Sequence, residues 1–98
     1  MARRATKQMA QDPYWDAVQE QMNNIQTIYA QYADKQPILL LDIQKQRIYV
    51  YPYFDFKDEL SEKSQLSLQD QYERANAENR IVVFVRDHDN RKLVSYTV

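Results

Sequence analysis

The only histidine of the chain, His88, lies in the polar segment Asp87-His88-Asp89-Asn90 and is the first residue to consider for chemistry. An imidazole flanked by carboxylates can act as a general base or as a metal ligand. Catalysis would need a partner group, and a metal site would need several ligands at a characteristic spacing. The sequence identifies neither, so we expect His88 to be a solvated residue of a turn.

Two further groups could carry catalytic chemistry, the carboxylates of Asp58, Glu59 and Glu62 and the hydroxyls of Ser61, Ser64 and Ser67. We expect the acids to solvate the start of a helix, whose dipole favours negative charge. The chain has no cysteine and no glycine. Without glycine it cannot form a nucleophile elbow or a phosphate-binding loop, and its turns must use Asn, Asp, Lys and Gln. We therefore expect no enzyme, no cofactor and no metal site.

Tyrosines occupy alternate positions in segment 47–54, RIYVYPYF. In an extended strand Tyr49, Tyr51 and Tyr53 would point to one face. Phe84 and Arg86 would share a face in the same way in segment 80–86, RIVVFVR. We expect an open aromatic and basic sheet face that acts as the interaction site and consists of Arg47, Tyr49, Tyr51, Tyr53, Phe84 and Arg86.

Three interpretations of this face remain open. Tyrosine suits half-exposed strands, so the rings can be ordinary structural residues. Tyrosine and arginine are also enriched at protein interfaces, so a partner can cover the face. The third interpretation is base stacking, because Arg47, Tyr49 and Tyr51 resemble the aromatic strand of RNA-recognition modules. Ile48 and Val50 replace the small residues of that motif, and the order of elements differs, so the family is not assigned.

The first half of the chain predicts a helix followed by a hairpin. Asp12-Pro13 is a helix start, because the aspartate can accept from free N–H groups and proline fits the first helical position. Apolar residues at spacings of three and four predict one continuous helix to about residue 33. Segments 38–43 and 47–54 then read as two strands joined by a tight turn.

The second half predicts another helix and another hairpin. A helix is expected over about 64–78, with Ser67 and Asp70 as a capping box. Segment 80–86 is the strongest strand signal, and segment 92–98 forms the returning strand.

The order αββαββ predicts a single α+β domain over residues 12–98. We expect a two-layer sandwich, in which two helices cover one face of a four-stranded antiparallel sheet. The same order fits a permuted ferredoxin-like arrangement, which places strands 47–54 and 92–98 in the centre of the sheet. A plainer alternative keeps the two hairpins side by side in another order.

The charge distribution limits where an anion could bind. The net charge is −1, from 13 basic and 14 acidic residues, which is not the basic excess of a typical nucleic-acid binder. Residues 1–11, with Arg3, Arg4 and Lys7, are predicted to form a flexible basic tail. Segment 79–98 carries four bases against two acids. An anion-binding surface is therefore expected on the tail or on the last two strands.

These features together favour a small non-enzymatic binding, adaptor or regulatory domain that acts through protein–protein contact. We expect self-association, as a homodimer or other homo-oligomer, through the aromatic face or a strand edge. The alternative is single-stranded nucleic-acid binding by the same tyrosines and the basic tail. The longest apolar run, residues 38–41, is too short to span a membrane, so we expect no membrane partner. Because the chain has no cysteine, we expect a cytoplasmic protein.

Overall fold

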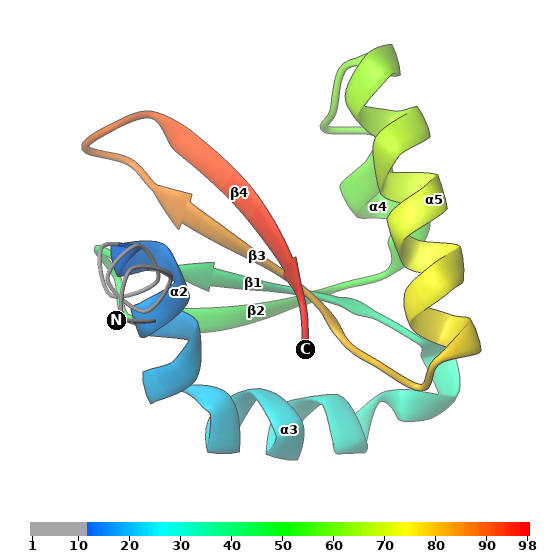
Figure 1. The fold of residues 1–98 in the computed structure, drawn as a ribbon, viewed down its shortest axis with the longest axis horizontal. Helices are drawn as coiled ribbons and strands as arrows, with labels where there is room; N and C mark the ends of the chain where they lie inside the picture. The colour runs from blue at the N-terminus through cyan, green and yellow to red at the C-terminus, as the bar shows by residue number, and fades with distance from the viewer. Residues whose placement is uncertain (1–11) are drawn as a thin grey trace, which may run out of the picture.

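Figure 1 shows the fold in a computed structural model that describes residues 12–98. The helices are α2 (Pro13–Glu20), α3 (Met22–Gln31), the 3-10 helix η1 (Ala33–Lys35), α4 (Tyr53–Lys57) and α5 (Glu62–Ala77). The strands are β1 (Ile38–Asp42), β2 (Arg47–Tyr51), β3 (Val82–Asp87) and β4 (Lys92–Thr97). The predicted α+β class is confirmed, and α4 is an additional element. The predicted tail, 1–11, lies outside the described residues.

The first predicted helix is present but broken into α2 and α3. Asp12 caps α2 by accepting hydrogen bonds of 3.1 Å from two backbone N–H groups of the first turn. The break is at Gln21, whose φ of −99° and ψ of 10° lie outside the helical region. A straight helix of twenty residues would be about 30 Å long, whereas a strand of five or six residues spans about 17–20 Å. The break lets Val18 of α2 and Ile25 of α3 both reach the same core.

The strands form one mixed sheet in the order β2-β1-β3-β4. The hairpins β1–β2 and β3–β4 are antiparallel, as predicted, but the central strands β1 and β3 run parallel. A parallel pair needs a long crossover connection, and here β2, α4 and α5 provide it. The prediction of a wholly antiparallel sheet is therefore wrong. The permuted ferredoxin-like order is also wrong, because it places segments 47–54 and 92–98 in the centre.

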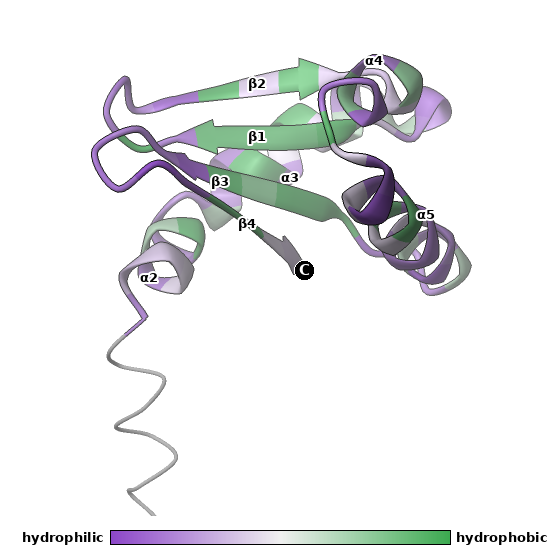
Figure 2. Ribbon diagram, turned by 90° about the horizontal axis from the view of Figure 1, so that it is seen from above, coloured by the Kyte–Doolittle hydropathy of each residue, from purple (hydrophilic) through white to green (hydrophobic). Residues whose placement is uncertain are grey.

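Helices cover both faces of the sheet (Figures 1 and 2). One core joins α2 and α3 to the sheet through Val18, Ile25, Leu39, Leu41, Val83 and Val85. The other core joins α4 and α5 to the opposite face through Ile38, Leu40, Phe56, Leu68, Ala75, Val82 and Phe84. The structure has three layers, so the prediction of two helices on one face is wrong.

The composition of the central strands explains the third layer. The sequences of β1, ILLLD, and β3, VVFVRD, begin with unbroken apolar runs, and Figure 2 shows both strands as apolar over most of their length. Every residue of β1 is buried, and so is every residue of β3 except Arg86. Such continuous runs are typical of parallel strands that are covered on both faces. Helices on a single face would leave half of these side chains in water.

Helix α5 begins at Glu62, earlier than predicted. Its N-cap is Ser61, whose hydroxyl accepts a hydrogen bond of 3.3 Å from the N–H of Ser64. The predicted capping pair, Ser67 and Asp70, lies inside the helix instead. Within residues 12–98 no helix is both long enough and apolar enough to cross a membrane.

The absence of glycine is visible in the turns. Four non-glycine residues have φ between 46° and 56°, in the left-handed region: Gln36, Gln46, Asn79 and Arg91. Each lies directly after a helix or in a hairpin turn. The expectation that Asn and Gln serve in place of glycine is confirmed for three of these turns, and the fourth uses arginine.

Truncation of Phe56 tests the packing of α4 on the sheet. The residue is 1% exposed, and its ring centroid lies 4.5 Å from that of Phe84. Phe56→Ala should lower the free energy of unfolding by about 3–5 kcal/mol, because it removes a buried ring and leaves a cavity. The control Phe54→Ala, on the same helix at a residue that is 69% exposed, should change it by less than about 0.5 kcal/mol. Urea titration measures both, and equally small effects would show that α4 does not cover this face.

Candidate functional site

The predicted aromatic face exists, but it is not open. Tyr49 lies opposite Leu40 in the register of β1 and β2, and Tyr51 lies opposite Ile38. Both tyrosines pack on the core beneath α4 and α5, as does Phe84, which is only 7% exposed. The predicted alternation along the strand is therefore confirmed for Tyr49 and Tyr51. The prediction that helices leave this face uncovered is wrong, because the second helical pair lies on it.

Tyr53 does not belong to the strand. β2 ends at Tyr51, and Tyr53 is the first residue of α4. Its ring stacks on that of Tyr72 in α5, with centroids 4.2 Å apart and an interplanar angle of 25°. The hydroxyl of Tyr72 in turn donates a hydrogen bond of 2.6 Å to the carbonyl of Gln36. These rings join α4 to α5 and are not displayed as a row.

The two arginines of the predicted site lie at the same end of the sheet. Arg47 begins β2 opposite Asp42 and is exposed. Arg86 lies beside Asp42 on the other side, in the register of β1 and β3, and its guanidinium is 3.9 Å from the carboxylate of Glu59. A binding role for the six residues stays a prediction, because only their positions are shown.

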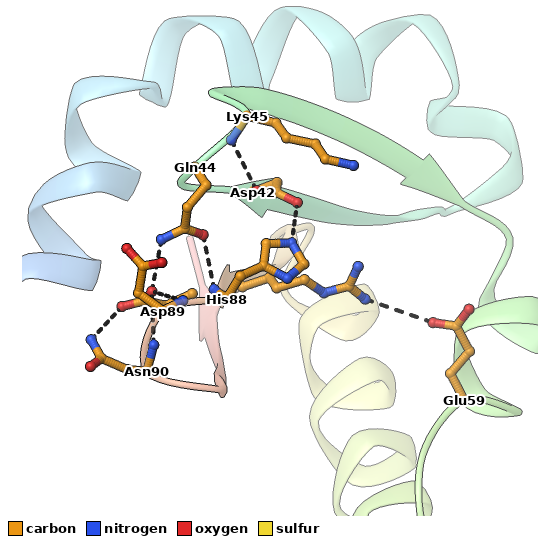
Figure 3. A network of polar contacts seen from close by, with 9 residues as sticks. Asp42, Gln44, Lys45, Glu59, His88, Asp89 and Asn90 are labelled. Atoms are coloured by element: carbon orange, nitrogen blue, oxygen red, sulfur yellow. Dashed lines mark hydrogen bonds and ion pairs between the residues drawn. The ribbon is translucent and has the colours of Figure 1, made fainter.

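A polar network lies where β1 and β3 end (Figure 3). Neighbouring parallel strands have their C-terminal ends on the same side of the sheet, which brings Asp42 and Asp87 into one region. Both carboxylates are buried, Asp42 at 1% exposure and Asp87 at 7%. Open α/β sheets usually bind their ligands at this end of the parallel strands.

The carboxylate of Asp87 is fully occupied by protein donors. One oxygen accepts from Gln44 at 2.8 Å and from the backbone N–H groups of Asp89 and Asn90 at 3.0 and 3.3 Å. The other accepts from the Tyr14 hydroxyl at 2.8 Å and from the Asn90 side chain at 2.7 Å. These contacts tie α2, the β1–β2 turn and the β3–β4 turn to one anion.

His88 is more than a solvated turn residue, because its side chain pairs with a buried carboxylate. Its Nε2 lies 2.8 Å from Asp42, while its ring remains 47% exposed. The backbone N–H of Lys45 donates to the other oxygen of Asp42 at 3.1 Å, and the N–H of His88 donates to Gln44 at 2.9 Å. The sequence contained a signal for this contact, since Asp42 lies near the end of predicted strand 38–43 and His88 lies in the turn after predicted strand 80–86.

The pKa values in the network reflect these donors. The hydroxyl of Tyr14, followed by the amides of Gln44 and Asn90, lowers the pKa of Asp87 to about 2, although burial acts in the opposite direction. For Asp42, burial disfavours the charged form, but the hydrogen bonds from His88 and from the Lys45 N–H outweigh it, and the pKa is lowered. Both groups are therefore held as carboxylates at neutral pH.

The network is better suited to structure than to catalysis. Among residues 12–98, no buried side-chain nitrogen or oxygen lacks a hydrogen-bond partner. The same residues contain no group of three or more His, Asp or Glu side chains placed to hold a metal ion. A carboxylate whose lone pairs are all engaged has little capacity to bind substrate. We conclude that the hydrogen bonds of Asp42 and Asp87 stabilise the β1–β2 and β3–β4 turns against each other.

The free edge of β4 offers unpaired backbone groups. Ile81 and Val98 exchange two hydrogen bonds of 2.8 Å, which sets the alternation of the antiparallel ladder. Every second residue before Val98, namely Tyr96, Val94 and Lys92, therefore forms backbone hydrogen bonds with β3. The residues between them, Leu93, Ser95 and Thr97, therefore direct their N–H and C=O groups away from the sheet.

This edge has little protection against a further strand. β4 contains no proline, and Lys92 at its start is its only charged residue. One of the outward backbone groups, the carbonyl of Thr97, already accepts a hydrogen bond of 2.7 Å from the guanidinium of Arg80. The other outward groups are free of protein partners within residues 12–98. Proteins usually block such edges, because unpaired backbone groups can pair with another strand.

The opposite edge of the sheet differs. The N–H of Ile43 donates a hydrogen bond of 3.1 Å to the carbonyl of Arg86, so the odd-numbered residues of β1 face β3 and its even-numbered residues face β2. The odd-numbered residues of β2 lie opposite these even-numbered residues and therefore direct their backbone N–H and C=O groups toward β1. Ile48 and Val50 then point outward, and the next outward position is Pro52, which has no N–H to offer. Proline is a common device for closing an edge strand. The β4 edge is the more open of the two.

A groove follows β4 on the side of α5. It consists of three adjoining hollows, which run from the β3–β4 turn to the C-terminal end of α5. The hollow at the turn and the middle hollow share Leu93 as a lining residue. The middle hollow and the hollow at the end of α5 share Ser67, Gln71 and Ser95. The middle hollow, of about 180 Å³, has an apolar floor formed by Leu60, Leu68, Phe84 and Leu93. The hollow at the C-terminal end of α5 is polar, with Asp70, Arg74, Glu78 and Arg80 around it. Edge and groove together form the candidate site.

The hydrogen bond from Tyr14 to Asp87 generates a prediction about pH. The folded-state pKa of Asp87, about 2, lies below the unfolded value of about 3.9, so its ionised form stabilises the fold above about pH 4. This contribution is lost as the pH falls from about 4 to 2. Tyr14→Phe removes the largest cause of the shift, so it should lower stability at pH 7 and flatten the loss between pH 4 and 2.

Urea titrations across this pH range measure both effects. The control Tyr32→Phe alters an exposed tyrosine and should leave the pH profile unchanged. A Tyr14→Phe profile parallel to that of the unaltered chain would show that Asp87 is not held by this hydroxyl.

Comparison of the chain with protein families, with curated proteins and with solved structures finds no match in any of the three. No family is therefore assigned.

Proposed function

We propose that this chain is a non-enzymatic protein-binding domain that accepts an extended strand on the free edge of β4. The observation that carries the proposal is the outward direction of Leu93, Ser95 and Thr97 on an edge without proline. Strand addition of this kind takes its affinity from main-chain hydrogen bonds and its specificity from pockets for alternate side chains. Here β4 supplies the main-chain hydrogen-bonding groups, and the groove beside α5 supplies the side-chain pockets.

The expected affinity is modest. Five outward groups of β4 remain after Arg80 occupies the carbonyl of Thr97. A net gain of about 0.5–1.5 kcal/mol for each of the five hydrogen bonds gives about 2.5–7.5 kcal/mol, before the cost of association. Side chains in the groove must add to this for binding in the micromolar range. Such affinity is typical of transient adaptor contacts.

Self-association stays a prediction, and the edge gives it a definite form. Two β4 strands could pair about a two-fold axis at Ser95, with Leu93 of each copy opposite Thr97 of the other. An isologous edge pairing of this kind would extend the sheet across the dimer. The same experiment therefore detects a second copy or another protein as the source of the strand.

The nucleic-acid alternative stays a prediction, and the packing of the tyrosines favours strand addition over it. Stacking of bases requires accessible rings, whereas Tyr49 and Tyr51 pack against the core under α4 and α5. The basic residues of the tail, Arg3, Arg4 and Lys7, lie outside the described residues.

Substitution of Ser95 tests the proposal. A blocked heptapeptide of alternating threonine and valine serves as a plain strand probe, and NMR titration of the ¹⁵N-labelled chain reports where it binds. The amides of Leu93, Ser95 and Thr97 should shift, and those of Ile48 and Val50 should not. Sedimentation equilibrium of the chain alone reports any self-association.

Ser95→Pro removes the central outward N–H and should abolish the shifts and any dimer. The control Ser95→Ala removes only the hydroxyl, which donates to Gln71 at 3.0 Å, and should retain both. Circular dichroism confirms that each variant is folded. If folded Ser95→Pro binds like the unaltered chain, or if the probe shifts residues elsewhere, the proposal is wrong.

A further inference from the structure

We infer that the groove between α5 and β4 binds an extended acidic segment of another protein, with an acidic side chain of that segment at Arg86 and Arg91. This inference rests on the proposed strand addition and names the chemistry of the partner. It is drawn from the charges at one end of the groove and from the apolar hollow beside them.

The end of the groove at the β3–β4 turn is cationic. A hollow of about 260 Å³ lies there, lined by Arg86, Asp87, His88, Arg91, Lys92 and Leu93. Arg86 is directly opposite Leu93 in the register of β3 and β4 and shares its face. Arg91 precedes Leu93 by two residues and lines the same hollow. Arg91 therefore lies at the free edge where β4 begins, and Arg86 lies one strand inward on β3 and lines the same hollow.

Of the two arginines in this hollow, Arg91 is the one that has no acidic partner among residues 12–98. The carboxylate of Asp87 accepts hydrogen bonds from the polar network, and that of Glu59 forms an ion pair with Arg86 at 3.9 Å. For Arg91, residues 12–98 contain no carboxylate within 4.0 Å. Arginine pairs favourably with carboxylates, often through two parallel hydrogen bonds. An incoming carboxylate would supply the missing counter-charge.

Charge decides between an acidic partner and a second copy. The sequence of β4, KLVSYT, contains no acidic residue. A second β4 strand paired at this edge would bring no acidic side chain to Arg91, whereas Arg86 keeps Glu59 as its partner. A strand that carries Asp or Glu at the right position would pair with Arg91, so the occupant is another protein.

Strand geometry gives the spacing of the recognition sequence. Residues directly opposite one another in an antiparallel pair lie on the same face of the sheet. A residue opposite Leu93 would therefore enter the apolar hollow under α5. In an antiparallel strand, the residue two positions later lies beyond the start of β4, next to Arg86 and Arg91. The predicted pattern is an apolar residue followed two positions later by Asp or Glu.

Four blocked heptapeptides test this pattern. The lead peptide is Thr-Val-Thr-Val-Leu-Val-Glu, and its relatives replace Leu by Ala, Glu by Lys, or both by Thr to give the plain probe. Fluorescence anisotropy of labelled peptides measures affinity at low salt, with the intact chain as receptor. The lead peptide should bind about tenfold or more tightly than the Ala and Lys peptides, because each loses one of the two side-chain contacts.

A charge exchange identifies the arginine. Arg91→Glu should weaken binding of the lead peptide by about tenfold and should bind the Lys peptide more tightly than the lead. The control Arg47→Glu, on the other edge strand, should change neither affinity. A preference for the Glu peptide that persists in Arg91→Glu would overturn the assignment of this residue.

Failure of this inference differs from failure of the proposed function. If all four peptides bind equally and Ser95→Pro abolishes their binding, the acidic pattern is wrong while strand addition stands. If none of them perturbs the β4 amides, both are wrong. Added salt should remove the difference between the lead and Lys peptides, since the ion pair is near the surface.

Discussion

The parallel pairing of β1 with β3 is the constraint on which the rest of the structure depends. Both strands begin with unbroken apolar runs, and a strand of this composition must be covered on both faces. Helices therefore lie on each side of the sheet, α2 and α3 on one and α4 and α5 on the other. Once both faces belong to cores, the edges and the grooves beside the helices are the surfaces left for binding.

The same pairing explains the polar network. Because the C-terminal ends of β1 and β3 lie side by side, Asp42 and Asp87 are close together, and the turns that follow supply hydrogen-bond donors to them. Asp87 receives hydrogen bonds from α2, from the β1–β2 turn and from its own turn. The β3–β4 turn is thereby held in place, and with it Arg86 and Arg91 at the end of the groove. The network therefore positions this end of the groove, and Asp87 and His88 line the hollow there.

Much of the local structure could be predicted from the sequence, and the tertiary arrangement could not. The cap at Asp12, the four strands and the alternation of Tyr49 and Tyr51 follow from short-range rules. The layer arrangement was mispredicted because the helices were assigned to one face, although the runs ILLL and VVFV indicate strands covered on both. Of the site, the basic character of the last two strands could be predicted. The outward direction of Ser95 depends on register, which composition does not determine.

Native-state hydrogen exchange of the β4 amides tests the central claim most directly, because it asks whether this edge is open in the isolated chain. At low protein concentration the amides of Leu93, Ser95 and Thr97 should exchange quickly, since they point away from β3. The amides of Val94 and Tyr96 should exchange much more slowly, since they belong to the ladder. Uniform protection along β4, or protection with the opposite alternation, would contradict an open β4 edge and the binding function built on it.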